Sequence, residues 1–231
     1  MKFVNPICLS LDCNDFATGM SLLKKISSPL GCIKVGPRLV LREGPKVIQE
    51  LKQIAPIFLD FKFYDIPSTT LESVRSAFEL GATLVTVHAS LGLNTLKELA
   101  TLEAELNQTR PFKILAVTVL TSYSQSSLPT VWQKKSIEAL IKDFAQEAIS
   151  AGITGIVCSP HEIASVKAAH PKAFVVTPGI RLASSTPDDQ SRVSSPKEAV
   201  AAGADLLVIG RPILQSKDPA QTVNDFIGSL L

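Results

Sequence analysis

The strongest constraint on the fold is a repeated alternation between short apolar runs and longer segments of helical period. Apolar runs of strand length occur eight times in the 231 residues, at positions 7–11, 32–36, 57–59, 84–88, 114–120, 155–158, 174–177 and 206–209. Helical segments lie between them, the clearest at 15–26, 67–80, 93–106 and 136–150. Such alternation is typical of parallel βα units. Eight units predict an α/β fold that closes as a (β/α)8 TIM barrel.

Glycine marks the ends of several helical segments. Gly81, Gly152 and Gly203 each follow a helical segment just before a strand, where glycine suits the left-handed C-cap of a helix. A chain of 231 residues with 45% hydrophobic residues is normal for one barrel with a large core. Since no linker or low-complexity tract interrupts the pattern, we predict a single barrel domain over residues 1–231.

The composition argues against several partners. A formal net charge of +2 is too small to suggest a nucleic-acid partner. No apolar run approaches the roughly 20 residues that span a bilayer, and the N-terminus lacks a signal-peptide core. We therefore expect a soluble, cytoplasmic protein with no membrane contact.

The four cysteines, Cys8, Cys13, Cys32 and Cys158, lie in or beside apolar runs without C-x-x-C spacing. This placement favours reduced, buried thiols. We assign them no disulfide and no metal.

Three charges of alternating sign follow the third apolar run. Because side chains alternate along a strand, Asp60 and Lys62 point to the same side, and Asp65 follows just before Ile66-Pro67 opens a helix. Two unit charges about 4 Å apart interact by roughly 4 kcal/mol at an effective dielectric of 20. A lysine between two aspartates therefore stays protonated and serves as a proton donor. The alternative is a structural ion pair at a strand end.

Polar residues also follow the other strands. In a TIM barrel the loops after the strands form the active face. Candidate residues at these positions are Asp12, Lys34, His88, Thr121, Ser122, Pro178, Gly179, Arg181, Gly210 and Arg211. The glycine-containing turns after strands seven and eight predict a phosphate site, since barrels often bind phosphate there. The alternative is that these glycines only terminate strands.

The spacing D-x-K-x-x-D-I-P-x-T, from Asp60 to Thr69, resembles the signature of the orotidine 5′-phosphate decarboxylase family. The turns at 120–122, 176–181, 188–190 and 209–212 also resemble family motifs. Ser68 stands where the family often has Asn, and Val119 where Gln is sometimes found. Neither position bears a catalytic group, so the difference affects contact details rather than the reaction.

The resemblance implies conversion of orotidine 5′-phosphate to UMP and CO2 without metal or cofactor. It implies a catalytic network of Lys62, Asp60, Asp65 and Lys34. It also implies a homodimer in which Asp65, Ile66 and Thr69 reach into the partner's site. Substrate contacts carried over from the family are Asp12, Lys34, Asp60, Ile66, Thr69, Thr121, Ser122, Pro178, Arg181, Gln190, Gly210 and Arg211.

Other interpretations remain open at this point. A sugar-phosphate decarboxylase or aldolase shares D-x-K-x-x-D but recruits magnesium, and a silent phosphate-binding barrel would need no reaction at all. We interpret His88 as a strand-end histidine with its hydrogen bonds satisfied, and Trp132 as a packing residue. Lys34 is either an ion-pair partner at the core edge or a site residue, and the cost of burying an amine favours the site.

Overall fold

The strands form one closed parallel barrel in which neighbours in sequence are neighbours in space. The computed structural model describes residues 2–182 and 193–230, and the strand order is β1 to β8 around the barrel. The TIM barrel predicted from the sequence is therefore confirmed. The strands are β1 (Ile7–Ser10), β2 (Cys32–Val35), β3 (Ile57–Phe63), β4 (Ala82–His88), β5 (Lys113–Val117), β6 (Gly155–Val157), β7 (Phe174–Pro178) and β8 (Leu206–Ile209).

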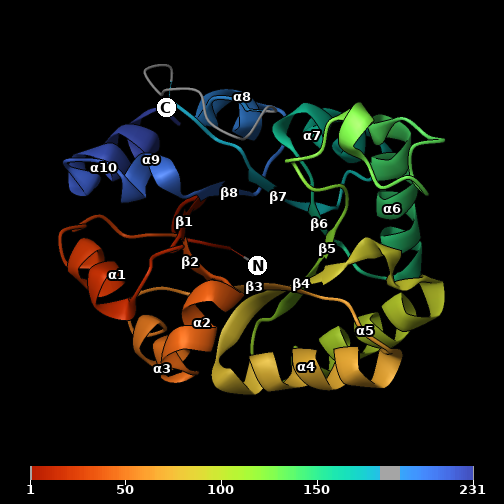
Figure 1. Cartoon of the computed structure of the whole chain (residues 1–231), viewed down its shortest axis with the longest axis horizontal. Helices are drawn as coiled ribbons and strands as arrows, with labels where there is room; N and C mark the ends of the chain where they lie inside the picture. Colours follow the sequence, from red (N-terminus) through yellow and green to blue (C-terminus); the bar gives the residue numbers. More distant parts are fainter. Residues whose placement is uncertain (1, 183–192, 231) are drawn as a thin grey trace.

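Helices surround the barrel on its outside (Figure 1). They are α1 (Phe16–Leu23), α2 (Pro37–Glu43), α3 (Lys46–Leu51), α4 (Pro67–Leu80), α5 (Leu93–Leu106), α6 (Ile137–Ala151), α7 (Ile163–Ala169), α8 (Pro196–Ala201), α9 (Arg211–Leu214) and α10 (Pro219–Gly228). Short 3-10 turns are η1 (Ala89–Leu91), η2 (Gln125–Ser127) and η3 (Pro160–Glu162). None of the helices within 2–182 and 193–230 has the length and apolar character needed to cross a bilayer.

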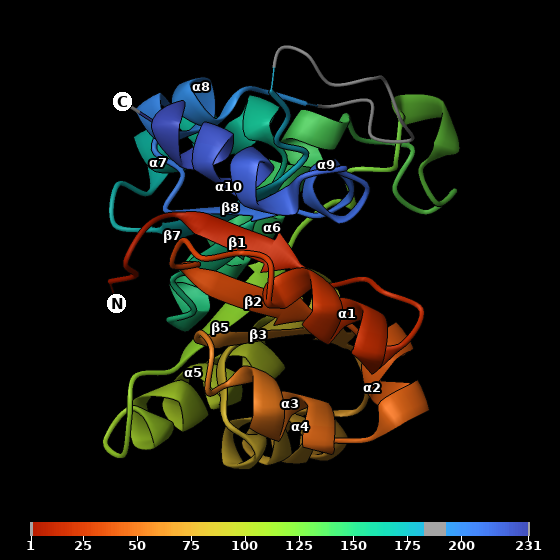
Figure 2. The ribbon, with the colours of Figure 1, turned by 90° about the vertical axis from the view of Figure 1, so that its left-hand side faces the viewer.

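Two apolar layers hold the barrel together. The larger lies between the sheet and the helices, and the smaller fills the barrel interior with Cys8, Cys32, Phe58, Leu84, Leu115, Val176, Leu206 and Val208. Phe3 packs against this interior layer, with its ring centroid 6.2 Å from that of Phe174. The N-terminus lies at the end of the barrel opposite to the one where the β1 arrow points (Figure 2). One end of the barrel is thus filled by side chains, and the carboxyl ends of the strands remain for a site.

Helix ends follow the sequence closely. The predicted helices 67–80 and 93–106 have the observed bounds of α4 and α5. Gly81, Gly152 and Gly203 have φ of 109°, 103° and 107°, which confirms the expected left-handed glycines.

Some expected strand and helix ends are too long. The fifth strand ends at Val117 rather than at residue 120, because its neighbour β6 ends at Val157 and offers no further ladder. The first strand ends at Ser10, and the first helix covers Phe16–Leu23 rather than 15–26.

An irregularity in β3 is the largest departure from the sequence prediction. Leu59 pairs with Val85 and Phe63 with Val87, so four steps along β3 correspond to two along β4. A bulge of this kind bends the strand and redirects side chains. It lies at the segment that carries Asp60 and Lys62.

Candidate active site

A cavity of about 810 Å³ lies at the carboxyl ends of the strands. On the side of β1 to β4 its lining is polar and includes Ser10, Asp12, Lys34, Asp60, Lys62 and Thr86. On the side of β5 to β8 the strands contribute apolar residues, among them Val117, Val157, Val176 and Val208. The segments that follow these strands add polar residues, among them Thr121, Ser122, Arg181 and Arg211. The cavity therefore offers a charged wall opposite a wall whose strand residues are apolar and whose loop residues are polar.

Strand periodicity places the charged wall. The interior layer contains Cys32 and Phe58, and the next residues that face the interior are two positions further along each strand. These residues are Lys34 and Asp60, which are largely buried. The barrel thus changes from apolar packing to a charged layer within one step of the pleat.

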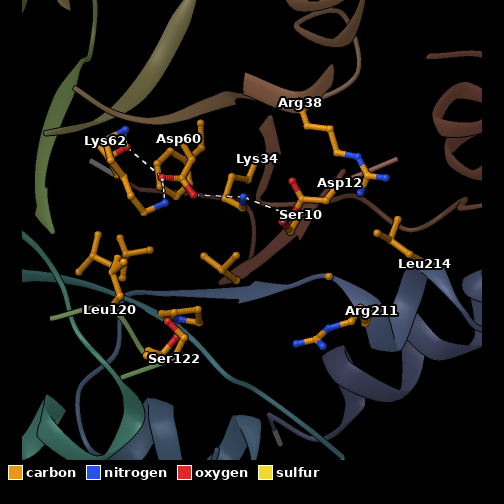
Figure 3. A pocket seen from close by; sticks show the side chains of 18 of the residues that line it. Ser10, Asp12, Lys34, Arg38, Asp60, Lys62, Leu120, Ser122, Arg211 and Leu214 are labelled. Carbon is orange, nitrogen blue, oxygen red and sulfur yellow. Dashed lines mark hydrogen bonds and ion pairs between the residues drawn. The ribbon is translucent and has the colours of Figure 1, made fainter. Parts of the chain in front are cut away.

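Asp60 is the centre of an ion-pair network. Its Oδ1 lies 2.8 Å from Nζ of Lys62, and its Oδ2 lies 3.1 Å from Nζ of Lys34 (Figure 3). Lys34 Nζ is also 3.5 Å from Oδ2 of Asp12, which accepts a hydrogen bond of 2.6 Å from the hydroxyl of Ser10. Two ammonium groups therefore share one carboxylate.

The network shifts the pKa values of its buried members. Burial alone would raise the pKa of Asp60, but the charges of Lys34 and Lys62 outweigh burial and lower it to about 2. Burial acts to lower the pKa of Lys34, and the charges of Asp60 and Asp12 raise it above its usual value. Both groups are thus held in their charged forms at neutral pH.

Lys62 differs from Lys34 in exposure and backbone conformation. The side chain of Lys62 is 39% exposed, against 11% for Lys34, so its amine is accessible from the cavity. Its φ of 50° is the one positive value at a non-glycine residue among the described positions. Such a conformation costs on the order of 1–3 kcal/mol and is often found at functional sites.

Asp65 does not join this network in the single chain. It is exposed, and its Oδ1 accepts a hydrogen bond of 2.7 Å from the backbone N–H of Ile66. Ile66 and Thr69 are exposed as well, and all three lie outside the cavity lining. The expectation that three charges meet at the strand end thus holds within one chain for Asp60 and Lys62 only.

Most of the remaining predicted site residues line the cavity, whereas the candidates Gly179 and His88 lie outside its lining. Figure 3 shows Lys62, Asp60, Lys34 and Asp12 along one side, with Leu120, Ser122 and Arg211 opposite. Thr121, Pro178, Arg181 and Gly210 also contribute to the lining, and Gln190 lies outside the described residues. A Cβ at position 210 would lie 3.3 Å from Cβ of Ser10, so glycine allows β8 to approach β1 closely here.

Comparisons with known proteins agree with this geometry. The model of the "Orotidine 5'-phosphate decarboxylase / HUMPS family" matches residues 5–226. The chain belongs to this family. The resemblance predicted from D-x-K-x-x-D-I-P-x-T is thereby confirmed.

Individual family members align over nearly the whole chain. The chain is 41% identical to "Orotidine 5'-phosphate decarboxylase" of Anaeromyxobacter sp. (strain K), over 95% of this chain and 96% of the relative. It is 40% identical to the protein of the same name from Dichelobacter nodosus, over 98% of this chain and 99% of the relative. The solved structure of "Orotidine 5'-phosphate decarboxylase from Lactobacillus acidophilus" superposes with a TM-score of 0.84 at 30% identity. It covers 98% of this chain and 99% of that chain.

His88 has the structural role predicted for it. Its Nδ1 accepts a hydrogen bond of 3.1 Å from the backbone N–H of Ser90 and so caps η1. Its ring stacks on Trp132 at 5.8 Å and meets the edges of Tyr64 and Phe144. Burial, and then the charge of Lys62, lower the pKa of His88. The packing role of Trp132 is confirmed too.

The predicted burial of the cysteines is confirmed for all four thiols. Among the described residues, no group of three or more His, Cys, Asp or Glu side chains has the arrangement of a metal site.

Sequence reasoning missed several residues of the cavity. Ser10, Thr86 and Arg38 all line it. Ser10 lies two positions before Asp12, and Thr86 two before His88, so period-two counting backward from the strand-end residues would have found both. Arg38 lies on α2 and carries no comparable sequence signal.

Because folding lowers the pKa of Asp60, the free energy of unfolding should vary with pH in the acid range. Because the carboxylate titrates near 2 in the folded chain and near 4 when unfolded, its contribution is complete above pH 4 and is lost as pH falls toward 2. This loss amounts to about 2 kcal/mol in the free energy of unfolding. Urea denaturation at pH 2–5 should show a shallower pH dependence for Asp60→Asn than for the wild type. Equal slopes would contradict the assigned ion pairs.

Proposed function

We propose that this protein decarboxylates orotidine 5′-phosphate to UMP and CO2 in de novo pyrimidine biosynthesis. The observation that carries the proposal is the ammonium group of Lys62, which Asp60 holds at 2.8 Å inside a cavity with a charged wall. The relatives named orotidine 5′-phosphate decarboxylase, aligned over nearly the whole chain, support the same reaction.

The reaction needs electrostatic stabilisation. When the bond between C6 and the carboxyl carbon breaks, CO2 leaves and the electron pair stays on C6, where no ring position absorbs it. Lys62 stabilises this carbanion as an ammonium ion, and then a proton moves from Nζ to C6. Solvent re-protonates the amine after product release. Repulsion between Asp60 and the substrate carboxylate is a smaller contribution in this scheme.

The network around Lys62 supports its role as a proton donor. Asp60 keeps a negative charge beside the amine, because its pKa is lowered to about 2. Lys34, which is ion-paired with Asp60 and Asp12, keeps that carboxylate in place. We propose that this set acts without metal or cofactor.

We propose further that the cavity divides its substrate contacts by position. Asp12 and Lys34 take the ribose, and Thr121 and Ser122 take the pyrimidine. The phosphate binds at the turns after β7 and β8, through Pro178, Arg181, Gly210 and Arg211, with Gln190 between phosphate and base. All of these except Gln190, which lies outside the described residues, line the cavity, and this placement supports the assignment.

A homodimer with shared sites is also part of the proposal. Asp65, Ile66 and Thr69 lie outside the chain's own cavity, in an exposed stretch that begins at Tyr64. Tyr64 and Ile66 are each 64% exposed. A second hollow, lined by Phe61, Phe63, Thr69 and other residues of β3 and α4, lies next to them. A partner chain would cover this surface and receive Asp65 near its Lys62.

Residues 1–231 are proposed to form one catalytic domain that works in the cytoplasm. The family model spans residues 5–226 and supports a single domain. The four buried cysteine thiols suit a reducing compartment.

Replacement of Lys62 tests the proposed reaction. Lys62→Ala should lower turnover of orotidine 5′-phosphate by at least about 10³-fold, because it removes both the charge and the proton. Lys97→Ala, which changes an exposed lysine on α5, should keep wild-type turnover. The measurement is the ultraviolet change of the substrate in chelator, with folding checked by circular dichroism.

Wild-type protein that fails to act in chelator, but acts with added magnesium on a sugar phosphate, would support the rival lyase. Near-wild-type turnover by Lys62→Ala would remove Lys62 from the donor role.

Arg211 tests whether phosphate binding contributes to the chemical step. Arg211→Ala should lower kcat/KM for orotidine 5′-phosphate by roughly 10²-fold, since binding energy at a remote group is used in the transition state. The same variant should match the wild type on orotidine, which lacks the phosphate. An equal loss on both substrates would show that Arg211 acts on the fold or on another part of the substrate.

Mixing two inactive variants tests the shared site. Lys62→Ala and Asp65→Asn should each lack activity alone. In a dimer of the two, one site has Lys62 from the second chain and Asp65 from the first, and is intact. Equimolar exchange should therefore restore about one quarter of wild-type activity. No recovery, with exchange verified by mass spectrometry, would mean that Asp65 acts within its own chain.

A further inference from the structure

The hydroxyl of Thr86 lies between the two central groups of the site. Thr86 belongs to β4 and is 1% exposed. Its Oγ1 accepts a hydrogen bond of 2.9 Å from the backbone N–H of Lys62 and donates one of 2.9 Å to Oδ1 of Asp60. One side chain thus contacts both the backbone of Lys62 and the carboxylate that pairs with its amine.

The bulge in β3 explains why a hydroxyl is needed at this position. Pairing between β3 and β4 passes from Leu59 and Val85 directly to Phe63 and Val87, so Thr86 faces the bulged residues without a regular ladder. The N–H of Lys62 needs an acceptor, and Asp60 gains from a donor. A hydroxyl can supply both at once, whereas an aliphatic side chain of the same shape supplies neither.

These contacts close a ring around Lys62. The amine of Lys62 donates to Oδ1 of Asp60 at 2.8 Å, the same oxygen that Thr86 binds. The backbone of Lys62 has a φ of 50°. A left-handed residue keeps this conformation only where its surroundings fix it. Within the described part of the chain, Thr86 is the residue whose side chain bonds to the backbone of Lys62. The direction of the lysine side chain therefore depends on a residue of the neighbouring strand.

We propose that Thr86 is a positioning residue for Lys62. Its hydroxyl holds the backbone of Lys62 in the left-handed conformation and fixes Asp60, and so aims the amine at the reacting carbon. Thr86 takes no part in proton transfer. The kinetic effect expected on removing this hydroxyl rests on the decarboxylation proposed above. The effect expected on the backbone of Lys62 rests only on the two hydrogen bonds of Thr86.

Three variants separate this role from ordinary packing. Thr86→Val keeps the shape and removes the hydroxyl, so kcat for orotidine 5′-phosphate should fall roughly 10-fold to 100-fold. KM, and the Kd for UMP measured by calorimetry, should stay within about 3-fold, because the proposed phosphate and ribose contacts are unchanged. Thr86→Ser keeps the hydroxyl and should recover most of kcat. If Thr86→Val does not fold, Thr86→Ala carries the same expectation.

Thr118→Val is the matched control. Thr118 is a buried threonine just after β5. Its hydroxyl donates a hydrogen bond of 2.9 Å to the carbonyl of Val157, and its backbone N–H donates one of 3.2 Å to the same carbonyl. This variant loses a comparable buried hydrogen bond but leaves Lys62 untouched. Its stability should fall while kcat stays at the wild-type value.

Several results would overturn the proposal. They are a wild-type kcat in folded Thr86→Val, a Thr86→Ser variant as slow as Thr86→Val, or an equal loss of kcat in Thr118→Val. A crystal structure of Thr86→Val in which Lys62 keeps its positive φ would also overturn it. The φ of Lys62 in Thr86→Val tests the positioning role even if the wild type does not release CO2 from orotidine 5′-phosphate. A wild type that does not release CO2 would refute the proposed function instead.

Discussion

The site depends on the ion pairs that the carboxylate of Asp60 makes with two lysine amines. An ion pair about 3 Å apart gains roughly 5 kcal/mol at an effective dielectric of 20, while the burial of each ion costs several kcal/mol. A single pair between two fully buried ions would therefore gain little. Here Asp60 has two partners, and one of them, Lys62, is partly exposed and has lost less hydration. The charged layer is stable because the charge of Asp60 is paired with two lysines, and because Lys62 keeps part of its hydration.

The barrel supplies this layer through simple geometry. Every strand except β6 places a buried apolar residue in the interior layer and then, two positions later, a residue that lines the cavity. In β1 to β4 this second residue is polar, and in β5 to β8 it is mostly apolar. The fold thus determines where each wall of the cavity lies. The residue that a strand places there determines whether that part of the wall is charged or apolar.

Much of this arrangement could be predicted from the sequence, and the reasons for the exceptions are physical. The strand count, α4, α5 and the left-handed glycines depend on local periodicity and backbone preference, and local signals are visible in one sequence. The bulge in β3 was missed because it depends on pairing with β4. The exposure of Asp65 could not follow from alternation either, because the residue lies beyond the end of the strand.

The bulge also explains how Asp60 and Lys62 of the D-x-K motif come close enough to form an ion pair. In a regular strand, residues 60 and 62 would project in parallel, about 7 Å apart along the chain. The left-handed turn at Lys62 instead brings Nζ back to 2.8 Å from Oδ1 of Asp60, while the side chain remains open to the cavity. The backbone strain at this residue is offset by the ion pair and by a hydrogen bond from its N–H to Thr86. The amine of Lys62 is therefore held by the carboxylate of Asp60, while the backbone of the same residue is held by Thr86 of the neighbouring strand.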